Sequence, residues 1–304
     1  MNSLKQILDS LNVGKVTSNE PLKNHTTWKI GGPAKLFFEP SSIEGLKLAM
    51  EEINKSGETW FIIGKGSNLL ISDEGIDGVV IKLGESLTEI KENGEIIKVG
   101  AGYSLIKLAT IMSKKGLSGL EFAGGIPGSV GGAVFMNAGA HGSDMSKILV
   151  RAHVLLPDGT FKWYSNEEMD FSYRTSRLQR DHGICIEAEL KLVSGDKEAI
   201  KKELQGNKDY RRKSQPWNYP CCGSVFRNPL PHYAGKLIEE AGLKGYSIGD
   251  AQISEMHANF IVNKGNATAK NVIDLITHIQ QTIKEDFNVK LETEVEQIGK
   301  VTLP

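Results

Sequence analysis

Apolar residues occur in short blocks along the first third of the chain, with the spacing of alternating strands and helices. Residues 34–40 and 60–63 are dense runs of large apolar side chains and predict buried strands. Between them, Ser41 and Glu44 have the spacing of a capping box, which predicts a helix that ends near Gly57. A short amphipathic helix precedes these elements. The pattern therefore indicates an α+β lobe.

The same block pattern continues towards the C-terminus and indicates two further lobes. Residues 104–116 have a helical pattern that ends at Gly116, a residue type that commonly ends helices. A charged connector at residues 195–216 interrupts the apolar blocks and suggests a boundary near residue 196. The other predicted elements are strands at residues 78–84, 95–102, 151–156, 184–193, 258–263 and 289–298, a turn at 157–159, and helices near 234–241 and 268–287.

These elements predict an α+β protein of two domains. The first domain takes in residues 1–196, with lobes at about 1–83 and 84–196. The second domain takes in residues 197–304. A chain of 304 residues is long enough for each part to have its own core.

Composition narrows the classes of function. The net charge is −1, with 36 basic and 37 acidic residues, which gives no support to nucleic-acid or membrane-surface binding. The three cysteines are an odd number, and Cys221 and Cys222 are adjacent, so a reducing compartment fits best. The N-terminus is too polar for a signal peptide, and no apolar run approaches the roughly 18 residues of a spanning helix. We expect a cytoplasmic protein, and no signal for an obligate protein partner is evident.

A glycine-rich segment, residues 121–142, is the most unusual part of the chain. It holds seven of the 33 glycines and one charged residue, Glu121. Clustered glycines disfavour an ordinary helix or strand and suggest close approach by another group. Two interpretations remain open: a tightly packed turn of small residues, or a wall of backbone against a flat or phosphorylated ligand.

A second glycine motif, GKGSN at residues 64–68, follows a predicted strand. It matches neither the P-loop nor the Rossmann fingerprint, because strand-like residues follow the glycines. A strand–turn–strand of this kind can direct several backbone N–H groups at an anion, but a plain hairpin turn has the same pattern. Together with residues 121–142, the motif suggests a site for a dinucleotide outside a Rossmann fold.

Six blocks in the same order resemble the UDP-N-acetylenolpyruvoylglucosamine reductase family, in its shorter form that lacks an extra substrate-covering loop. The resemblance covers almost the whole chain. The blocks are NHTTWKIGGPA (24–34), IGKGSNLLISD (63–73), GLEFAGGIPGSVGGAVFMNAGAHG (119–142), FSYRTSRL (171–178), CCGSVFRNP (221–229) and LETEVEQIG (291–299).

The resemblance implies an α+β flavoenzyme of peptidoglycan precursor synthesis. The implied fold is a two-lobed FAD-binding domain of the vanillyl-alcohol-oxidase (PCMH) type with a C-terminal α+β substrate domain. It also implies an oxidoreductase that acts on a CH–CH group: NADPH reduces a non-covalent FAD, and hydride from flavin N5 reduces the enolpyruvyl ether of UDP-N-acetylglucosamine enolpyruvate to UDP-N-acetylmuramate. His25 is therefore not expected to bind flavin covalently. No His or Cys spacing suggests a metal site.

Three residues match the catalytic positions of the family. Arg174 would bind the developing carboxylate dianion with its fork of donors. Ser224 would donate the proton to carbon. Glu294 would act as the protonated acid beside the intermediate, although Glu292 and Glu296 alternate with it and leave some ambiguity.

The resemblance also implies binding residues. Tyr173, Lys213 and Asn228 resemble substrate-binding positions, and Arg211, Arg212 and Lys213 are candidates for the UDP phosphates, although such charged runs are usually solvated helix ends. The predicted FAD-binding residues are Ile63, Gly64, Lys65, Gly66, Ser67, Asn68, Gly124, Gly125, Ile126, Pro127, Gly128, Ser129, Gly131, Gly132, Asn137, Gly139 and Ala140.

Two other functions fit the same fold. An oxidase would transfer electrons to oxygen, but it has no need of proton donors such as Ser224 and Glu294. A nucleotide-sugar binding module without turnover would contain no flavin. The behaviour of bound flavin with air, NADPH and the enolpyruvyl substrate distinguishes all three.

Overall fold

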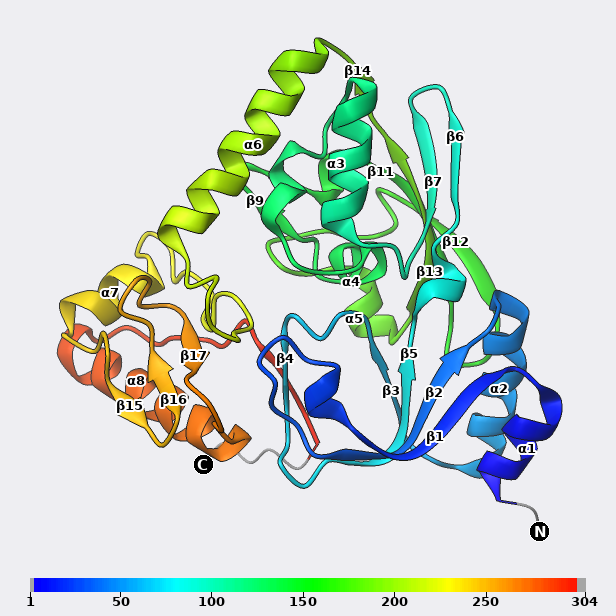
Figure 1. Ribbon diagram of the computed structural model, residues 1–304, viewed down its shortest axis with the longest axis horizontal. Coiled ribbons are helices and arrows are strands. Elements are labelled where there is room, and N and C mark those ends of the chain that lie inside the picture. Colours follow the sequence, from blue (N-terminus) through cyan, green and yellow to red (C-terminus); the bar gives the residue numbers. More distant parts are fainter. Residues whose placement is uncertain (1–2, 300–304) are drawn as a thin grey trace. The chain divides into compact units, whose positions relative to one another are not determined.

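The computed structural model describes residues 3–299 and divides into two compact units (Figure 1). Unit 1 takes in the described parts of Met1–Ser18, Leu36–Lys65 and Gly78–Arg211. Unit 2 takes in those of Asn19–Lys35, Gly66–Asp77 and Arg212–Pro304. The units therefore differ from the predicted domains, because two N-terminal segments belong to unit 2 and the change to unit 2 after unit 1 comes at residue 212 rather than near 196.

The N-terminal elements follow the predicted pattern with one shift. Ser42, not Ser41, is the N-cap of α2 (Ile43–Ser56) and accepts a hydrogen bond from the Gly45 N–H at 2.9 Å. Ser41 instead donates to the Val13 carbonyl. The helix ends at Gly57, whose φ of 72° is left-handed, as predicted. The first helix is α1 (Leu4–Leu11), and a four-stranded sheet has the order β1 (Gly14–Pro21), β2 (Pro33–Pro40), β5 (Ile76–Lys82), β3 (Trp60–Ile63).

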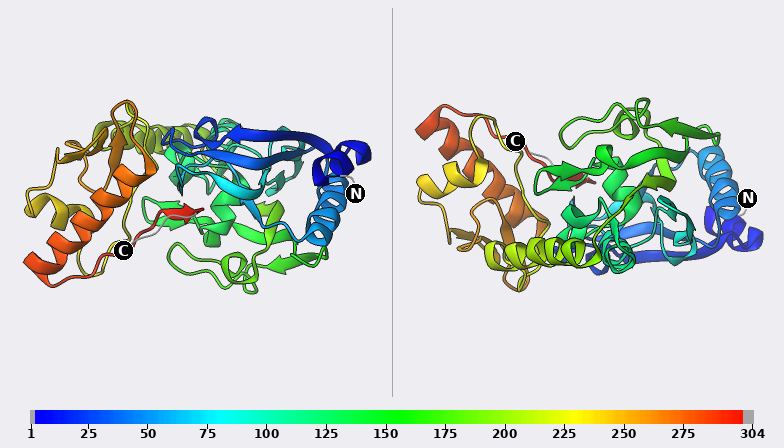
Figure 2. Two further views of the ribbon diagram at one scale, coloured as in Figure 1. Left: turned by 90° about the horizontal axis from the view of Figure 1, so that it is seen from below. Right: turned by 90° about the horizontal axis from the view of Figure 1, so that it is seen from above.

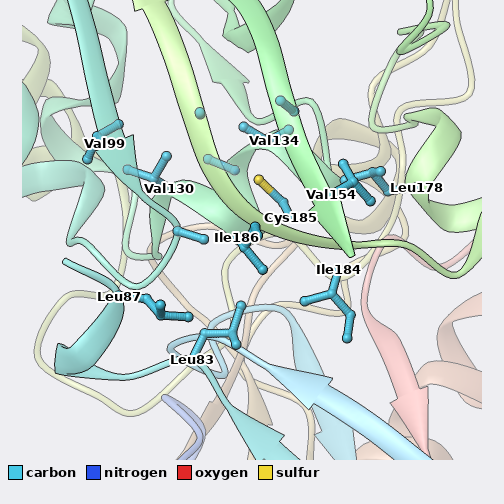
Figure 3. Close-up of a cluster of buried hydrophobic side chains, with 14 of the residues drawn as sticks. Leu83, Leu87, Val99, Val130, Val134, Val154, Leu178, Ile184, Cys185 and Ile186 are labelled. Carbon is cyan, nitrogen blue, oxygen red and sulfur yellow. The ribbon is translucent and has the colours of Figure 1, made fainter. Parts of the chain in front are cut away.

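A five-stranded antiparallel sheet forms the centre of unit 1. α4 (Val130–Phe135) packs against its middle strand, β13, and α3 (Leu105–Lys115) ends at Gly116 as predicted. Figure 3 shows the buried cluster at this sheet, with the Cys185 thiol among Val134 and Val154. The strand order is β12 (Phe161–Ser165), β11 (Leu149–Leu155), β13 (Ile184–Lys191), β7 (Ile96–Gly100), β6 (Ile90–Asn93).

The charged connector and the glycine-rich segment both contain helices. The charged connector forms α6 (Lys197–Ser214), which buries only Ile200 and Leu204 of its side chains. The glycine-rich segment contains α4, so the expectation that it holds no ordinary helix is wrong for those residues. The remaining elements of unit 1 are η2 (Glu85–Leu87), β8 (Leu117–Ser118), η3 (Glu121–Gly125), β9 (Gly139–Ala140), β10 (Ser143–Asp144), η4 (Met145–Lys147), α5 (Arg177–Asp181) and β14 (Val193–Ser194).

Unit 2 has its core along one long helix, α8 (Ala269–Phe287), which packs against β15 and β16 (Figures 1 and 2). Trp28 is fully buried in this core and donates its indole N–H to the Ile261 carbonyl at 2.8 Å. The other elements are η1 (Leu22–Asn24), α7 (Ala234–Glu240), β15 (Ser247–Ile248), β16 (Ala251–Ile253), β17 (Ile261–Asn263), and the parallel pair β4 (Leu69–Ile71) and β18 (Glu296–Ile298).

The two strands predicted nearest the C-terminus are much shorter than expected. The strand predicted at 258–263 begins only at Ile261. The strand predicted at 289–298 is confined to β18, and Thr293 upstream forms an isolated antiparallel bridge with Phe226. Among the described residues, none of the helices is long and apolar enough to cross a membrane.

Candidate active site

The two glycine motifs meet in unit 1. Gly64 lies directly after β3, and a Cβ atom built on it would lie 2.5 Å from Ser129 Oγ. Ser129 is buried and caps α4, accepting from the Gly132 N–H at 3.3 Å. A side chain at residue 64 would therefore collide with the Ser129 hydroxyl, which caps α4. This contact is consistent with the predicted cooperation of the two motifs.

Several glycines of the long segment contact protein rather than open space. A Cβ at Gly124 would lie 2.4 Å from Leu204 Cδ1, and one at Gly125 would lie 2.4 Å from Arg211 Cδ. Both partners belong to α6. The sequence left open whether the glycines of this segment pack tightly against protein. Gly124 and Gly125 do so, on the side where a side chain would extend.

The first N–H groups of α4 already have hydrogen-bond acceptors within the protein. The Val130 N–H donates to the Tyr103 carbonyl and the Gly131 N–H to the Ala101 carbonyl, both at 2.9 Å. A Cβ at Gly131 would also lie 2.7 Å from Ala101 Cβ. The N–H groups that open this short helix therefore stabilise the fold, which leaves residues 64–65 and 124–129 of unit 1 as the better candidates to hold phosphate.

We expect Gly64→Ala to lower the flavin content of the purified protein, because the added methyl cannot fit unless residue 64 moves or the Ser129 hydroxyl leaves its capping position at α4. The ratio of flavin absorbance to protein measures the effect. Gly206→Ala is the matched control: nothing lies within 4 Å of a Cβ at that helical position, and alanine should stabilise α6 by about 1 kcal/mol.

The double variant Gly64→Ala with Ser129→Ala tests the cause. Without Oγ, the nearest Ser129 atom is Cβ at 3.6 Å, an ordinary contact distance. The double variant should therefore hold more flavin than Gly64→Ala alone. A double variant with equal or lower flavin content would show that the collision is not the reason for the loss.

Arg174 is at the tip of a tight turn in unit 1. Ser172 and Thr175 exchange two backbone hydrogen bonds of 3.1 Å, which leaves Tyr173 and Arg174 as the two central residues. Arg174 has a φ of 57°, a left-handed value that is costly for an arginine. Its guanidinium lies over the Tyr173 ring at 4.8 Å and donates through Nη2 to the Gly139 carbonyl at 2.8 Å.

Asn137 fixes this turn to the end of the glycine-rich segment. It is 4% exposed, donates its Nδ2–H to the Ser172 carbonyl at 3.0 Å and accepts the Ser146 N–H at Oδ1 at 3.0 Å. Both ends of its amide are therefore used within the protein. Asn137, predicted to bind FAD, orients the turn that carries Arg174.

Ser224 and Glu294 lie on hydrogen-bonded neighbouring segments of unit 2. The Glu294 N–H donates to the Val225 carbonyl at 2.7 Å, and the Arg227 N–H donates to the Glu292 carbonyl at 2.9 Å. Ser224 follows Gly223, whose φ of 89° favours glycine. Both catalytic candidates are half-buried. The pairing of the two segments fixes the register of Ser224 relative to Glu294.

The GKGSN turn also reaches the Glu294 segment. Asn68 donates its Nδ2–H to the Glu294 carbonyl at 3.0 Å, and its own carbonyl accepts the Glu296 N–H at 3.0 Å. Gly66 is obligatory here, because its φ is 61° and a Cβ would lie 2.1 Å from the His25 carbonyl oxygen. Asn68, predicted to bind FAD, therefore positions the backbone of Glu294.

The three alternating glutamates have different environments. Glu292 is exposed, Glu294 is half-buried, and Glu296 belongs to β18. Burial raises the pKa of the Glu296 carboxyl, an effect that the charge of Arg227 opposes. A carboxyl whose pKa is raised by folding makes its full contribution to the free energy of unfolding below its unfolded pKa, near 4.5. That contribution is lost as the pH rises through the pKa of the folded state.

We therefore expect Glu296→Gln to reduce the pH dependence of stability. The variant avoids burying an ionised carboxylate at neutral pH, so its free energy of unfolding should fall less than that of the unmodified protein between acid and neutral pH. Urea unfolding at the two pH values measures the difference. Glu292→Gln, at an exposed position of the same segment, should leave the pH dependence unchanged; equal behaviour of both variants would contradict the assignment.

The three predicted substrate-binding residues, Tyr173, Lys213 and Asn228, differ in their exposure and in their contacts. Tyr173 is 51% exposed beside Arg174. Lys213 and Arg212 are exposed near the end of α6, where Arg212 lies 5.7 Å from the Trp217 ring centre. Asn228 accepts the Ala234 N–H at 3.1 Å through Oδ1 and so supports the start of α7.

The cysteines form no disulfide, and residues 3–299 contain no group of three or more His, Cys, Asp or Glu side chains that would hold a metal. Burial raises the pKa of Cys185 to about 12. Burial also raises the pKa of Cys222, with further contributions from the charges of Cys221 and Glu294.

The residues of unit 1 fit the predicted flavin cofactor. Gly64 lies so close to the Ser129 hydroxyl that a Cβ atom at residue 64 would not fit between the two glycine motifs. Residues 124–129 and 64–65 would hold FAD, with main-chain N–H groups and Lys65 as donors to its phosphates.

Comparisons with known proteins identify families for both parts of the chain. The FAD binding domain family matches residues 34–165, and the family described as UDP-N-acetylenolpyruvoylglucosamine reductase, C-terminal domain, matches residues 215–298. The chain is 63% identical to the UDP-N-acetylenolpyruvoylglucosamine reductase of Halalkalibacterium halodurans, over 99% of this chain and 100% of the relative. It is 60% identical to that of Bacillus subtilis, over 98% and 99% of the two chains.

A solved structure agrees with these relatives. The crystal structure of UDP-N-acetylenolpyruvylglucosamine reductase from Thermus caldophilus superposes with a TM-score of 0.81 at 38% identity, over 93% of this chain and 98% of that one. The FAD-binding fold predicted from the sequence resemblance is thereby confirmed.

Proposed function

Because the chain belongs to the UDP-N-acetylenolpyruvoylglucosamine reductase family, we propose that it reduces its substrate with electrons from NADPH and with Arg174, Ser224 and Glu294 as catalytic residues. The chain is an FAD-dependent oxidoreductase that reduces the enolpyruvyl ether of UDP-N-acetylglucosamine in peptidoglycan precursor synthesis. The observation that best supports the catalytic assignment is the pairing of the Ser224 and Glu294 segments, with 2.7 Å between Glu294 N and Val225 O.

The reaction requires separate delivery of hydride and proton. FAD held by residues 64–65 and 124–129 would supply the hydride that adds to the terminal methylene carbon of the enolpyruvyl group. The electron pair of the double bond then moves to the neighbouring carbon and into the carboxylate, so the substrate carries extra negative charge until that carbon is protonated. The protein must therefore provide cationic or acidic groups at the carboxylate and a proton donor at carbon.

Arg174 is suited to bind the carboxylate. Its guanidinium uses Nη2 for the Gly139 carbonyl and lies over the Tyr173 ring, and these contacts limit its rotation. A guanidinium held in this way can present its other N–H groups to both carboxylate oxygens without first losing conformational freedom. Its left-handed φ is a local strain of the kind that occurs at functional sites.

Ser224 is proposed to donate its hydroxyl proton to carbon. A hydroxyl is a weak acid, but the carbanion-like intermediate is a strong base, so transfer requires correct placement more than high acidity. Glu294 is proposed to act protonated beside the intermediate, because an ionised carboxylate would repel the added charge. Tyr173, Lys213 and Asn228 are proposed substrate contacts.

An anaerobic absorption experiment tests the function. NADPH should bleach the bound flavin, and UDP-N-acetylglucosamine enolpyruvate should restore its colour. Rapid recovery with oxygen but none with the enolpyruvyl substrate would indicate an oxidase instead. A purified protein without flavin absorption would indicate a binding module.

A further inference from the structure

Asn259 is a buried amide that holds the chain next to Ser224. It is 4% exposed in unit 2, just before β17. Its Oδ1 accepts the Phe226 N–H at 2.9 Å, and its Nδ2–H donates to the Phe226 carbonyl at 2.8 Å. Its main-chain carbonyl accepts the Val225 N–H at 2.9 Å. One residue thus satisfies three backbone groups of the segment that follows Ser224.

The opposite edge of the same segment pairs with the Glu294 segment. The Val225 carbonyl accepts the Glu294 N–H, and Phe226 forms a bridge with Thr293. Residues 225–227 therefore have hydrogen-bond partners on both sides, as a central strand has. On the Asn259 side, the partner at Phe226 is a side-chain amide in place of a second strand.

Asn259 is itself held in place. Its N–H donates to His257 Nδ1 at 3.2 Å, and the turn before it is stabilised by Ser254, whose hydroxyl accepts the Met256 N–H at 3.1 Å. Ser254 is also 4% exposed. These contacts hold the backbone from which the Asn259 side chain reaches Phe226.

We propose that Asn259 is a positioning residue for the reductase reaction: it holds Ser224 in register with Glu294. The inference rests on the proposed role of Ser224 as proton donor. Proton transfer to carbon depends steeply on placement, and a misplacement of about 1 Å can cost on the order of a hundredfold in rate. Loss of the Asn259 amide leaves the Phe226 N–H and carbonyl without these partners, so the segment must move to satisfy them.

The test compares Asn259→Ala with Asn263→Ala in the full-length, FAD-loaded protein. Asn263 is a matched control, because it is 3% exposed, lies in the same unit and also uses both ends of its amide. Its Nδ2–H donates to the Trp28 carbonyl at 3.0 Å, and its Oδ1 accepts the Gly265 N–H at 2.9 Å. Both variants should lower the thermal midpoint, as the loss of a buried amide generally does.

Only Asn259→Ala should affect proton delivery. In stopped-flow experiments, flavin reduction by NADPH should stay within about twofold, whereas reoxidation by the enolpyruvyl substrate should slow by roughly 10- to 100-fold. The solvent deuterium isotope effect on reoxidation should rise, because proton transfer becomes more rate-limiting. Hydrogen exchange at the Phe226 amide, which does not depend on catalysis, should accelerate in Asn259→Ala alone.

Asn259→Asp provides a second variant in case the alanine variant does not fold. The carboxylate can still accept from the Phe226 N–H but repels the Phe226 carbonyl; once protonated, it can donate to that carbonyl. The reoxidation defect should therefore diminish as pH falls. Equal slowing of flavin reduction and reoxidation in the Asn259 variants would overturn the proposal. Selective slowing of reoxidation in Asn263→Ala would overturn it as well. If the unmodified protein were not reoxidised by the substrate, the proposed function would fail, while the exchange result would still report on the Asn259 contact.

Discussion

Ser224→Ala is expected to abolish most of the substrate-dependent reoxidation of the flavin while leaving its reduction by NADPH nearly intact. Removal of one positioned group at a reacting centre typically costs on the order of a hundredfold or more. The methyl of alanine retains the Gly223 turn and the pairing of Val225 with Glu294, because both involve only the main chain near residue 224. The loss should therefore be confined to proton transfer.

Stopped-flow measurement of the two half-reactions checks this expectation. Ser247→Ala is a suitable control, because Ser247 is exposed at the start of β15 in the same unit. Its hydroxyl donates to the Gly245 carbonyl at 3.2 Å. It should react like the unmodified protein. Equal losses of both half-reactions in Ser224→Ala would instead make the serine a structural or flavin-binding group.

The parts of the fold that local physics determines could be predicted from the sequence. The ends of α2 and α3 were predicted from Gly57 and Gly116, because each requires a left-handed φ. The long helix α8 was predicted because its apolar positions repeat with helical spacing. The connector that forms α6 was missed: it buries only Ile200 and Leu204, too few apolar positions to indicate a helix.

The sequence named candidate residues for the site, but it did not indicate which segments surround them. The resemblance supplied Arg174, Ser224 and Glu294, whereas the neighbours of each glycine depend on segments that are distant in sequence. Leu204 beside Gly124 and Arg211 beside Gly125 illustrate this, since both come from the helix that was missed. A glycine in the sequence indicates that another group approaches the backbone closely, but it does not identify that group.

Asn259 was missed for a related reason. Its only signal in the sequence is a polar residue inside the apolar pattern of residues 258–263, where a strand was predicted. Such a residue is commonly a side chain on the solvent side of a strand. Its pairing with Phe226 depends on a contact 33 positions away in the sequence, which periodicity cannot indicate.

Arg174→Lys is expected to slow substrate-dependent reoxidation by roughly 10- to 100-fold, the range that corresponds to loss of a charge-assisted hydrogen bond. The ammonium of lysine is a single point of donation, so it cannot contact the Gly139 carbonyl and both oxygens of a carboxylate as a guanidinium can. It also loses the contact of the guanidinium with the Tyr173 ring, which limits the motion of the side chain.

The stability of Arg174→Lys should stay close to that of the unmodified protein. The left-handed φ is retained, because the turn is closed by the backbone bonds between Ser172 and Thr175 and by the Asn137 amide. Arg177→Lys is the matched control: Arg177 lies in the adjacent α5 and pairs with Asp181 at 2.6 Å in a partly exposed position, where an ion pair typically contributes about 1 kcal/mol. Unimpaired reoxidation in Arg174→Lys would remove the guanidinium from the mechanism, since charge alone would then suffice to bind the carboxylate.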